Sequence, residues 1–190
     1  MRTLVSSLAY VVTFGNLAFA QKDVSISIPF DSTAQVYSYT GVVETAELTD
    51  SILYSNARIW LIGKNGNSEF EEDAPNNRIM DKGAFTVDAT FSMGVARART
   101  QSLVNYVISL EFKPGRYRYT IYRFGLGGDA TSTTPTQPLE AFVTRSQEKG
   151  MGRKANVRYA EDVCAAIDAE VIKLISEMRT HLAKPSKKDW

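Results

Sequence analysis

The chain has 190 residues, with 22 lysines and arginines against 21 aspartates and glutamates, and only one cysteine and one histidine. This balance excludes the clear basic excess with which most nucleic-acid modules neutralise phosphate. The single cysteine excludes a disulfide framework within the chain. None is needed, because a domain of this size buries roughly 70% of the surface that its unfolded chain exposes.

The first twenty residues, MRTLVSSLAYVVTFGNLAFA, have the order of a secretory signal. Arg2 is the only charge, an apolar run follows, and Ala18 and Ala20 stand where a signal peptidase requires small residues. Polar residues and a glycine interrupt the run, whereas a membrane span needs ~20 mostly apolar residues. The sequence predicts residues 1–20 as a signal peptide, cleaved before Gln21, and a periplasmic or secreted protein. The sequence has no lipobox cysteine after the apolar run, and we expect the cleaved protein to have no membrane-spanning segment.

Beyond the signal, composition suggests an entry segment at 21–34, a single α+β domain at 35–182 and a C-terminal tail at 183–190. Within the domain, residues 125–156 form a variable connector rich in glycine, threonine and proline. The first element is a strand at Gln35–Glu44, where tyrosine, valine and threonine are concentrated.

After this strand the spacing of the apolar residues changes to that of a helix, which predicts a helix in the stretch ELTDSILYSNARIWLIGKNGN. Thr49 or Asp50 can cap its first turn, and Gly63 and Gly66 end it. Its apolar side is expected to hold Ile52, Leu53, Asn56, Ile59 and Trp60.

The acidic stretch that follows, SEFEEDAPNNR, is expected to be a solvated loop. Its carboxylates have neither the alternating spacing nor the glycine of a calcium loop. They are Glu69, Glu71, Glu72 and Asp73. The sequence therefore predicts no metal and no other cofactor.

Strict alternation of apolar and polar residues predicts two half-buried strands, at 83–93 and 104–112. The segment between them, GVARARTQS, is expected to be a hairpin loop or a strand end. After the second strand, Pro114 and Gly115 suit the two corners of a type II turn. This turn would pair 104–112 with a third strand at 116–124.

The stretch EFKPGRYRYTIYRF alternates arginine with aromatic residues, as single-stranded nucleic-acid platforms do. A platform needs its rings and cations on one face, whereas period two places Tyr117 and Tyr119 opposite the arginines. Tyr122 and Phe124 are expected on the arginine side. The candidate binding surface consists of Arg116, Arg118 and Tyr122.

The strongest helix pattern closes the chain before Pro185. Its apolar stripe is expected to lie on the sheet, with Cys164 packed as a small apolar group. His181, near the helix end, is expected to be structural rather than a base. The sequence contains no recognisable set of catalytic residues, and it therefore predicts that the protein is not an enzyme. Carboxylates that only folding brings together cannot be identified from the sequence.

Five stretches, FDSTAQVYSYTGVVE, ARIWL, IMDKGAFTV, VNYVISLEFKPGRYRYTIYRF and IDAEVIKLISEM, resemble the exported Bacteroidota family called domain of unknown function 4468, which has a TBP-like fold. The resemblance covers most of Ile28–Met178. Its most specific parts are Gly83-Ala84-Phe85 and the hairpin arm GRYRYTIYRF. The chain departs from the family at 64–78 and 125–156.

The resemblance implies a curved antiparallel sheet with two helices packed on one face, in the order strand, helix, strands, helix. It brings no catalytic residues. The TATA-binding protein bends DNA with such a sheet, but a fold does not carry its function from one protein to another.

Three functions follow as hypotheses. The first is a non-catalytic binding or envelope-associated module for a protein or small-molecule ligand. The alternative is a hydrolase-type enzyme whose site is not visible in the sequence. The lesser alternative is nucleic-acid binding through the sheet. We expect no such partner for an exported chain whose residues 21–190 hold 21 basic and 21 acidic residues.

Overall fold

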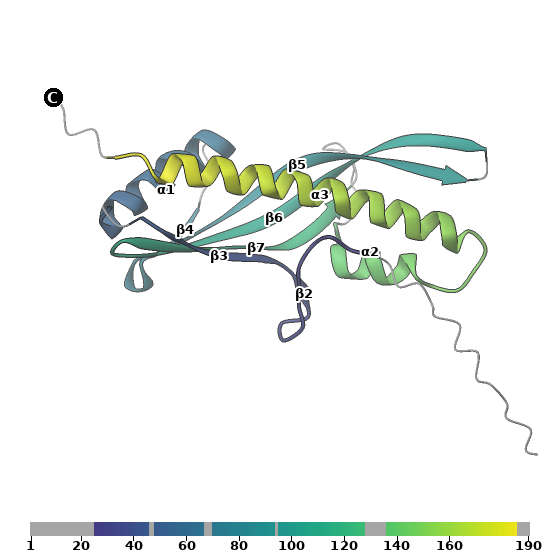
Figure 1. Ribbon diagram of the computed structural model, residues 1–190, viewed down its shortest axis with the longest axis horizontal. Helices are drawn as coiled ribbons and strands as arrows, with labels where there is room; N and C mark the ends of the chain where they lie inside the picture. Colours follow the sequence, from purple (N-terminus) through teal and green to yellow (C-terminus); the bar gives the residue numbers. More distant parts are fainter. Residues whose placement is uncertain (1–24, 46–47, 67–69, 94, 128–135, 186–190) are drawn as a thin grey trace, which may run out of the picture.

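The computed structural model describes residues 25–45, 48–66, 70–93, 95–127 and 136–185. The predicted signal at 1–20 and most of the predicted C-terminal tail lie outside these ranges. The described chain is α+β, with an antiparallel sheet and helices on one face (Figure 1). The predicted fold class is therefore confirmed.

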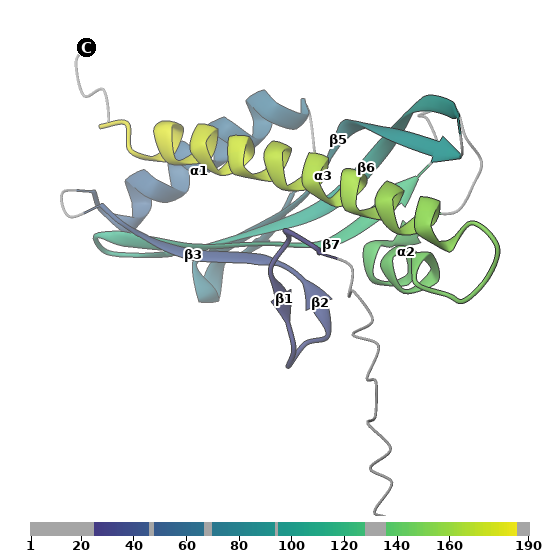
Figure 2. The same ribbon diagram turned by 45° about the vertical axis from the view of Figure 1, so that its right-hand side comes forward.

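The main sheet contains five strands side by side, and a short sixth strand pairs with the end of one of them. In spatial order the five are β3 (Tyr39–Glu44), β7 (Arg116–Gly127), β6 (Ala96–Lys113), β5 (Arg78–Met93) and β4 (Glu71–Asp73). The sixth, β8 (Gln137–Pro138), pairs with β7. A separate hairpin of β1 (Phe30–Asp31) and β2 (Val36–Tyr37) projects away from the two long helices at 50–65 and 153–182 (Figure 2).

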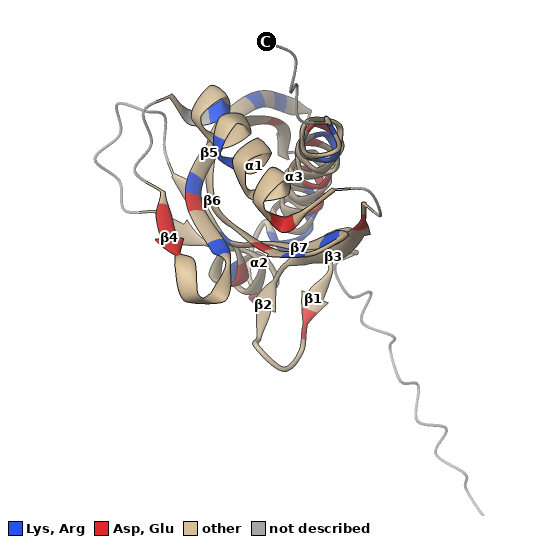
Figure 3. Ribbon diagram, turned by 90° about the vertical axis from the view of Figure 1, so that its left-hand side faces the viewer, with Lys and Arg blue, Asp and Glu red and all other residues tan. Residues whose placement is uncertain are grey.

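Three helices accompany the sheet: α1 (Asp50–Asn65), α2 (Leu139–Ser146) and α3 (Arg153–Leu182). The sheet curls around α1 and α3, so these two helices fill its concave side (Figure 3). The two expected helices are thus present. Helix α2 was not expected, because its eight residues bury only Leu139, Val143 and Ser146 and give too short a pattern to read.

The apolar stripe of α3 is buried as predicted. It consists of Ala160, Val163, Cys164, Ile167, Val171, Leu174, Met178 and Leu182. In α1, Thr49 caps the first turn by accepting a hydrogen bond from the Ile52 amide. The predicted apolar side of α1 was partly wrong: Leu53 and Trp60 are buried, but Ile59 is 66% exposed. Ala57 and Leu61 complete the buried side instead.

Several predicted boundaries were wrong because tertiary pairing decided them. The acidic loop holds an edge strand, β4, followed by a 3-10 helix at Ala74–Asn76. By contrast, the segment GVARARTQS was expected to be a hairpin loop or a strand end, and it is strand from Ala96, where β6 begins. The first predicted strand is divided at Ser38 between β2 and β3.

The β6–β7 hairpin has the predicted turn and register. Lys113 pairs with Arg116, and Gly115 has a φ of 74°, as the second corner of a type II turn requires. The turn is attached to the segment after β3, because the Thr45 amide donates to the Gly115 carbonyl (2.7 Å) and the Gly115 amide donates to the Leu48 carbonyl (3.1 Å). The turn is therefore held against the β3–α1 connection.

The prediction for Phe124 was wrong. The register shifts between Asn105 and Val107, so that β7 has one extra residue opposite Tyr106. Arg123 at this bulge has a φ of 55°. A bulge reverses the alternation of side chains beyond it, and Phe124 consequently turns to the inner face, where it is 1% exposed.

Two glycines lie beneath tyrosine rings on the inner face of the sheet. Gly41 pairs directly with Tyr119, and Gly83 pairs with Tyr106. A methyl group at Gly83 would lie 2.3 Å from the Tyr106 hydroxyl oxygen. Covering a strand glycine with a cross-strand ring restores packing that the glycine lacks, which gives a physical reason for the glycine in Gly83-Ala84-Phe85.

We therefore predict that Gly83→Ala lowers the free energy of unfolding by about 1–3 kcal/mol, the usual cost of overpacking. Tyr106 is 3% exposed and packs against Phe85 at 5.5 Å between ring centroids, so its ring has little room to move. Urea denaturation measures the effect. As a matched control, Gly63→Ala in α1 meets no atom within 4 Å and should raise stability by about 0.5–1 kcal/mol. Equal stability of the two variants would contradict this prediction.

Candidate binding face of the sheet

The open face is defined here as the side of β3, β7, β6 and β5 that points away from α1 and α3. Period two places Arg116, Arg118, Thr120 and Tyr122 of β7 on this face. Their neighbours Tyr117, Tyr119 and Ile121 are buried on the inner face. The predicted separation of the arginines from Tyr117 and Tyr119 is confirmed.

Charges of both signs alternate along one row across the open face. In register, Val42, Arg118, Glu111, Arg78 and Asp73 lie opposite one another on successive strands. Arg118 pairs with Glu111 at 2.6 Å, and Arg78 pairs with Asp73 at 2.7 Å. The Asn76 side chain, aided by Arg78, lowers the pKa of Asp73. This row is a neutral ladder rather than a polycation.

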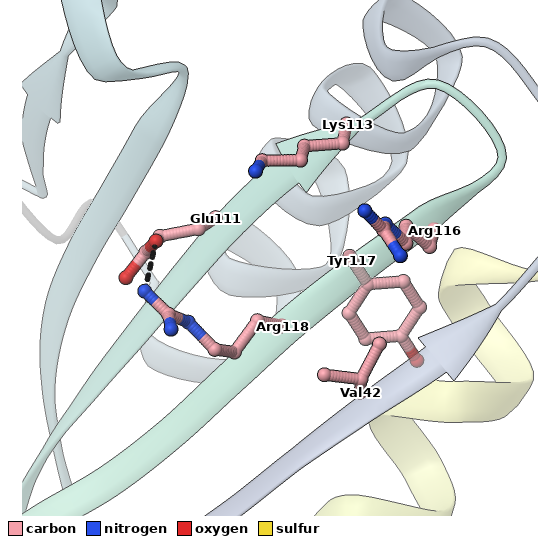
Figure 4. Close-up of a pocket in the computed structure, with 6 residues that line it drawn as sticks. All are labelled: Val42, Glu111, Lys113, Arg116, Tyr117 and Arg118. Carbon is pink, nitrogen blue, oxygen red and sulfur yellow. Dashed lines mark hydrogen bonds and ion pairs between the residues drawn. The ribbon is translucent and has the colours of Figure 1, made fainter.

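A hollow of about 280 Å³ lies beside this row (Figure 4). Its lining residues are Val42, Glu111, Lys113, Arg116, Tyr117 and Arg118. Three of them are cationic and one is a carboxylate, which is already bound to Arg118. The hollow is therefore positive and has an apolar wall at Val42.

Lys113 and Arg116 face each other directly across the turn. Like charges in this position destabilise a strand pair. Within the part of the chain that the structure describes, neither side chain has an ion pair, although Glu44 lies opposite Arg116 on β3. An anionic group bound in the hollow would relieve this repulsion.

Tyr122 belongs to a second hollow, of about 260 Å³, on the same face. Its lining includes Met80, Lys82, Val107 and Arg123, and the Arg123 guanidinium carbon lies 5.7 Å from the Tyr122 ring centroid. A row containing Thr120 and Ser109 separates the two hollows.

The structure thus brings two of the three predicted surface residues, Arg116 and Arg118, into one hollow and leaves Tyr122 in another. Sequence reasoning missed Lys113. The position of Lys113 directly before the Pro-Gly turn could have predicted its place beside Arg116, because a two-residue turn pairs the residues that flank it.

Cys164 and His181, which the sequence predicted to be structural, lie apart from each other on α3. They are seventeen positions apart along the helix, which corresponds to about 25 Å. Cys164 is fully buried, and burial raises the pKa of its thiol to about 12. His181 is exposed, with Nδ1 3.0 Å from the Glu177 carbonyl oxygen. They cannot act together on one substrate.

A partly buried polar contact lies near Cys164. The Tyr39 hydroxyl donates to Asp168 Oδ1 at 2.6 Å. Burial, together with this hydrogen bond, raises the pKa of Tyr39. The contact joins β3 to α3 and holds the edge of the sheet against the helix.

None of the groups of histidine, cysteine, aspartate and glutamate in the described ranges is placed to hold a metal ion. None of the described helices is long and apolar enough to cross a membrane.

We predict that iodoacetamide does not label Cys164 in the folded protein at pH 8. The thiolate is the reactive form, and a pKa of about 12 leaves almost none of it. Labelling followed by intact mass should become complete in denaturant. Rapid labelling of the native protein would show that the thiol is accessible and reopen the case for a nucleophile.

No protein-family model matches the sequence, and no match was found among curated proteins. Solved structures that are similar in fold include the following two. A TBP-like protein from Parabacteroides distasonis has a TM-score of 0.62 and 12% identity, over 84% of this chain and 99% of that chain. A DUF4468 family protein from Bacteroides ovatus has a TM-score of 0.61 and 15% identity, over 85% of this chain and 94% of that chain.

The two TM-scores establish a shared fold. The chain has a TBP-like fold, as the resemblance implied.

Proposed function

We propose that the protein is an exported, non-catalytic binding module of the cell envelope, and that its open face contacts the partner. The observation that carries this proposal is the pair of cations, Lys113 and Arg116, that face one another in an open hollow without an ion-pair partner among the described residues. Groups left in this state stabilise the folded chain little, but they are available to a ligand.

Two further features support a contact role for this face. Arginine and tyrosine are the residue types most enriched at binding hot spots, and the open face presents both. Val42 adds an apolar side chain that is 56% exposed. Export is supported by the signal-like order of residues 1–20.

The family relationship is also part of the proposal. We infer that the chain is a divergent member of the Bacteroidota family called domain of unknown function 4468. Shared fold with a member of that family and the motif GRYRYTIYRF support this inference.

The two other functions receive less support. The neutral ladder from Arg118 to Asp73 gives nucleic acid no continuous line of cations. The distance between Cys164 and His181 along α3 removes the simplest hydrolase arrangement.

Affinity capture tests the proposal. The protein, expressed from the full chain in an exporting host, is crosslinked in the envelope, and its partners are identified by mass spectrometry. Charge reversal at the hollow, Arg116→Glu, should remove a partner that the native protein retains. The matched control is Arg158→Glu, at an exposed position of α3, which should leave capture unchanged.

Circular dichroism of both variants confirms folding before capture is compared. The proposal fails if no partner exceeds background, or if Arg158→Glu and Arg116→Glu reduce capture equally. Intact mass of the purified protein tests export separately, because cleavage before Gln21 has a defined mass.

A further inference from the structure

The two edges of the sheet differ in how they are protected. An open strand edge presents unpaired backbone groups, and proteins usually shorten it or place charges on it. At one edge, β4 has three residues, Glu71, Glu72 and Asp73, and all are acidic. At the other edge, β3 has six residues, without proline or lysine, and Glu44 is its only charge. Only the β4 edge has the usual protection.

Strand β3 is held firmly in place although its outer edge is open. All six of its residues are paired with β7, and no described strand pairs with its other side. The Tyr39 hydroxyl anchors one end of β3 to Asp168 of α3, and the Thr45 amide anchors the other end to Gly115. A rigid open strand is the preorganised template that strand addition requires.

The open edge adjoins the cationic hollow. Val42 belongs to both, because its side chain points to the open face from β3 and lines the hollow. Neighbouring strands lie about 4.8 Å apart, so a strand added to β3 would lie about 10 Å from β7. Arginine and glutamate side chains together span that distance.

We propose that an extended acidic peptide segment adds to the outer edge of β3 and places a carboxylate in the hollow beside Arg116 and Lys113. The peptide backbone pairs with β3, and its alternate side chains lie on the open face. Charge complementarity selects an acidic segment, because Arg118 is engaged by Glu111 while Arg116 and Lys113 are not. This inference rests on the proposed function and names the partner's chemistry.

Fluorescence anisotropy with a short labelled peptide, in which glutamate alternates with valine, tests the inference. One comparison peptide carries glutamine in place of glutamate. A second is methylated on alternate backbone nitrogens, which removes the donors that strand pairing needs. The acidic peptide should bind about tenfold or more tightly than either comparison peptide, and added salt should weaken it.

Variants of the full chain locate the site. Arg116→Glu and, separately, Lys113→Gln should weaken the acidic peptide, whereas Arg158→Glu should not. Because Lys113→Gln also removes a like-charge contact, it should fold at least as well as the native protein, so its loss of binding cannot be attributed to unfolding.

Three outcomes would overturn the inference. Equal binding of the glutamine peptide would show that the protein does not recognise the negative charge of the peptide. Equal binding of the methylated peptide, with competition by inorganic phosphate, would make the hollow a simple oxyanion site. A dimer in sedimentation that dissociates in Val42→Lys would assign the edge to a second copy of this chain.

The peptide and capture experiments fail independently. If a partner depends on Arg116 in envelope capture but the acidic peptide does not bind, the proposed function stands and the acidic-strand inference is wrong. If the peptide binds as expected but no partner is captured, the site exists and the envelope role is wrong.

Discussion

Helix α3 lies in the curl of the sheet, and the burial of its apolar stripe decides where the other side chains point. Each strand that meets the helix must turn alternate residues inward, as Tyr117 and Ile121 of β7 do. Because side chains alternate along a strand, the intervening residues then point to the opposite side of the sheet. The open face, with Arg116 and Arg118, is therefore a consequence of packing at α3.

The same packing constrains the backbone. The buried rings of Tyr119 and Tyr106 lie over Gly41 and Gly83, so a larger residue at either position would displace a ring from the core. At the other end of the sheet, the Pro114-Gly115 turn is bonded to the β3–α1 connection. These contacts fix β3 and the β6–β7 hairpin relative to one another, and the cationic hollow lies between them.

Charge on this fold is arranged locally rather than in excess. Along the row from Arg118 to Asp73 each cation has a carboxylate, and surface pairs of this kind stabilise the fold only slightly. Lys113 and Arg116, which flank the Pro114-Gly115 turn, differ because neither has a carboxylate as an ion-pair partner among the described residues. In the described part of this almost neutral chain, a hollow lined by three cations thus lies beside an open strand edge whose only charge is Glu44. Binding at such a site depends on geometry more than on net charge.

The sequence alone determined the features that depend on local pattern: the alternating strands, the α3 stripe, the turn at Pro114 and Gly115, and the face on which Arg116 and Arg118 lie. It did not predict α2, the strand pairing of Glu71–Asp73 or the bulge at Arg123, because those depend on which segments meet in the folded chain. The bulge is the clearest case, since one extra residue opposite Tyr106 moved Phe124 from the open face to the core. The cationic hollow likewise required tertiary structure: pairing across the turn brings Lys113 to Arg116, and pairing between distant strands brings Val42 beside them.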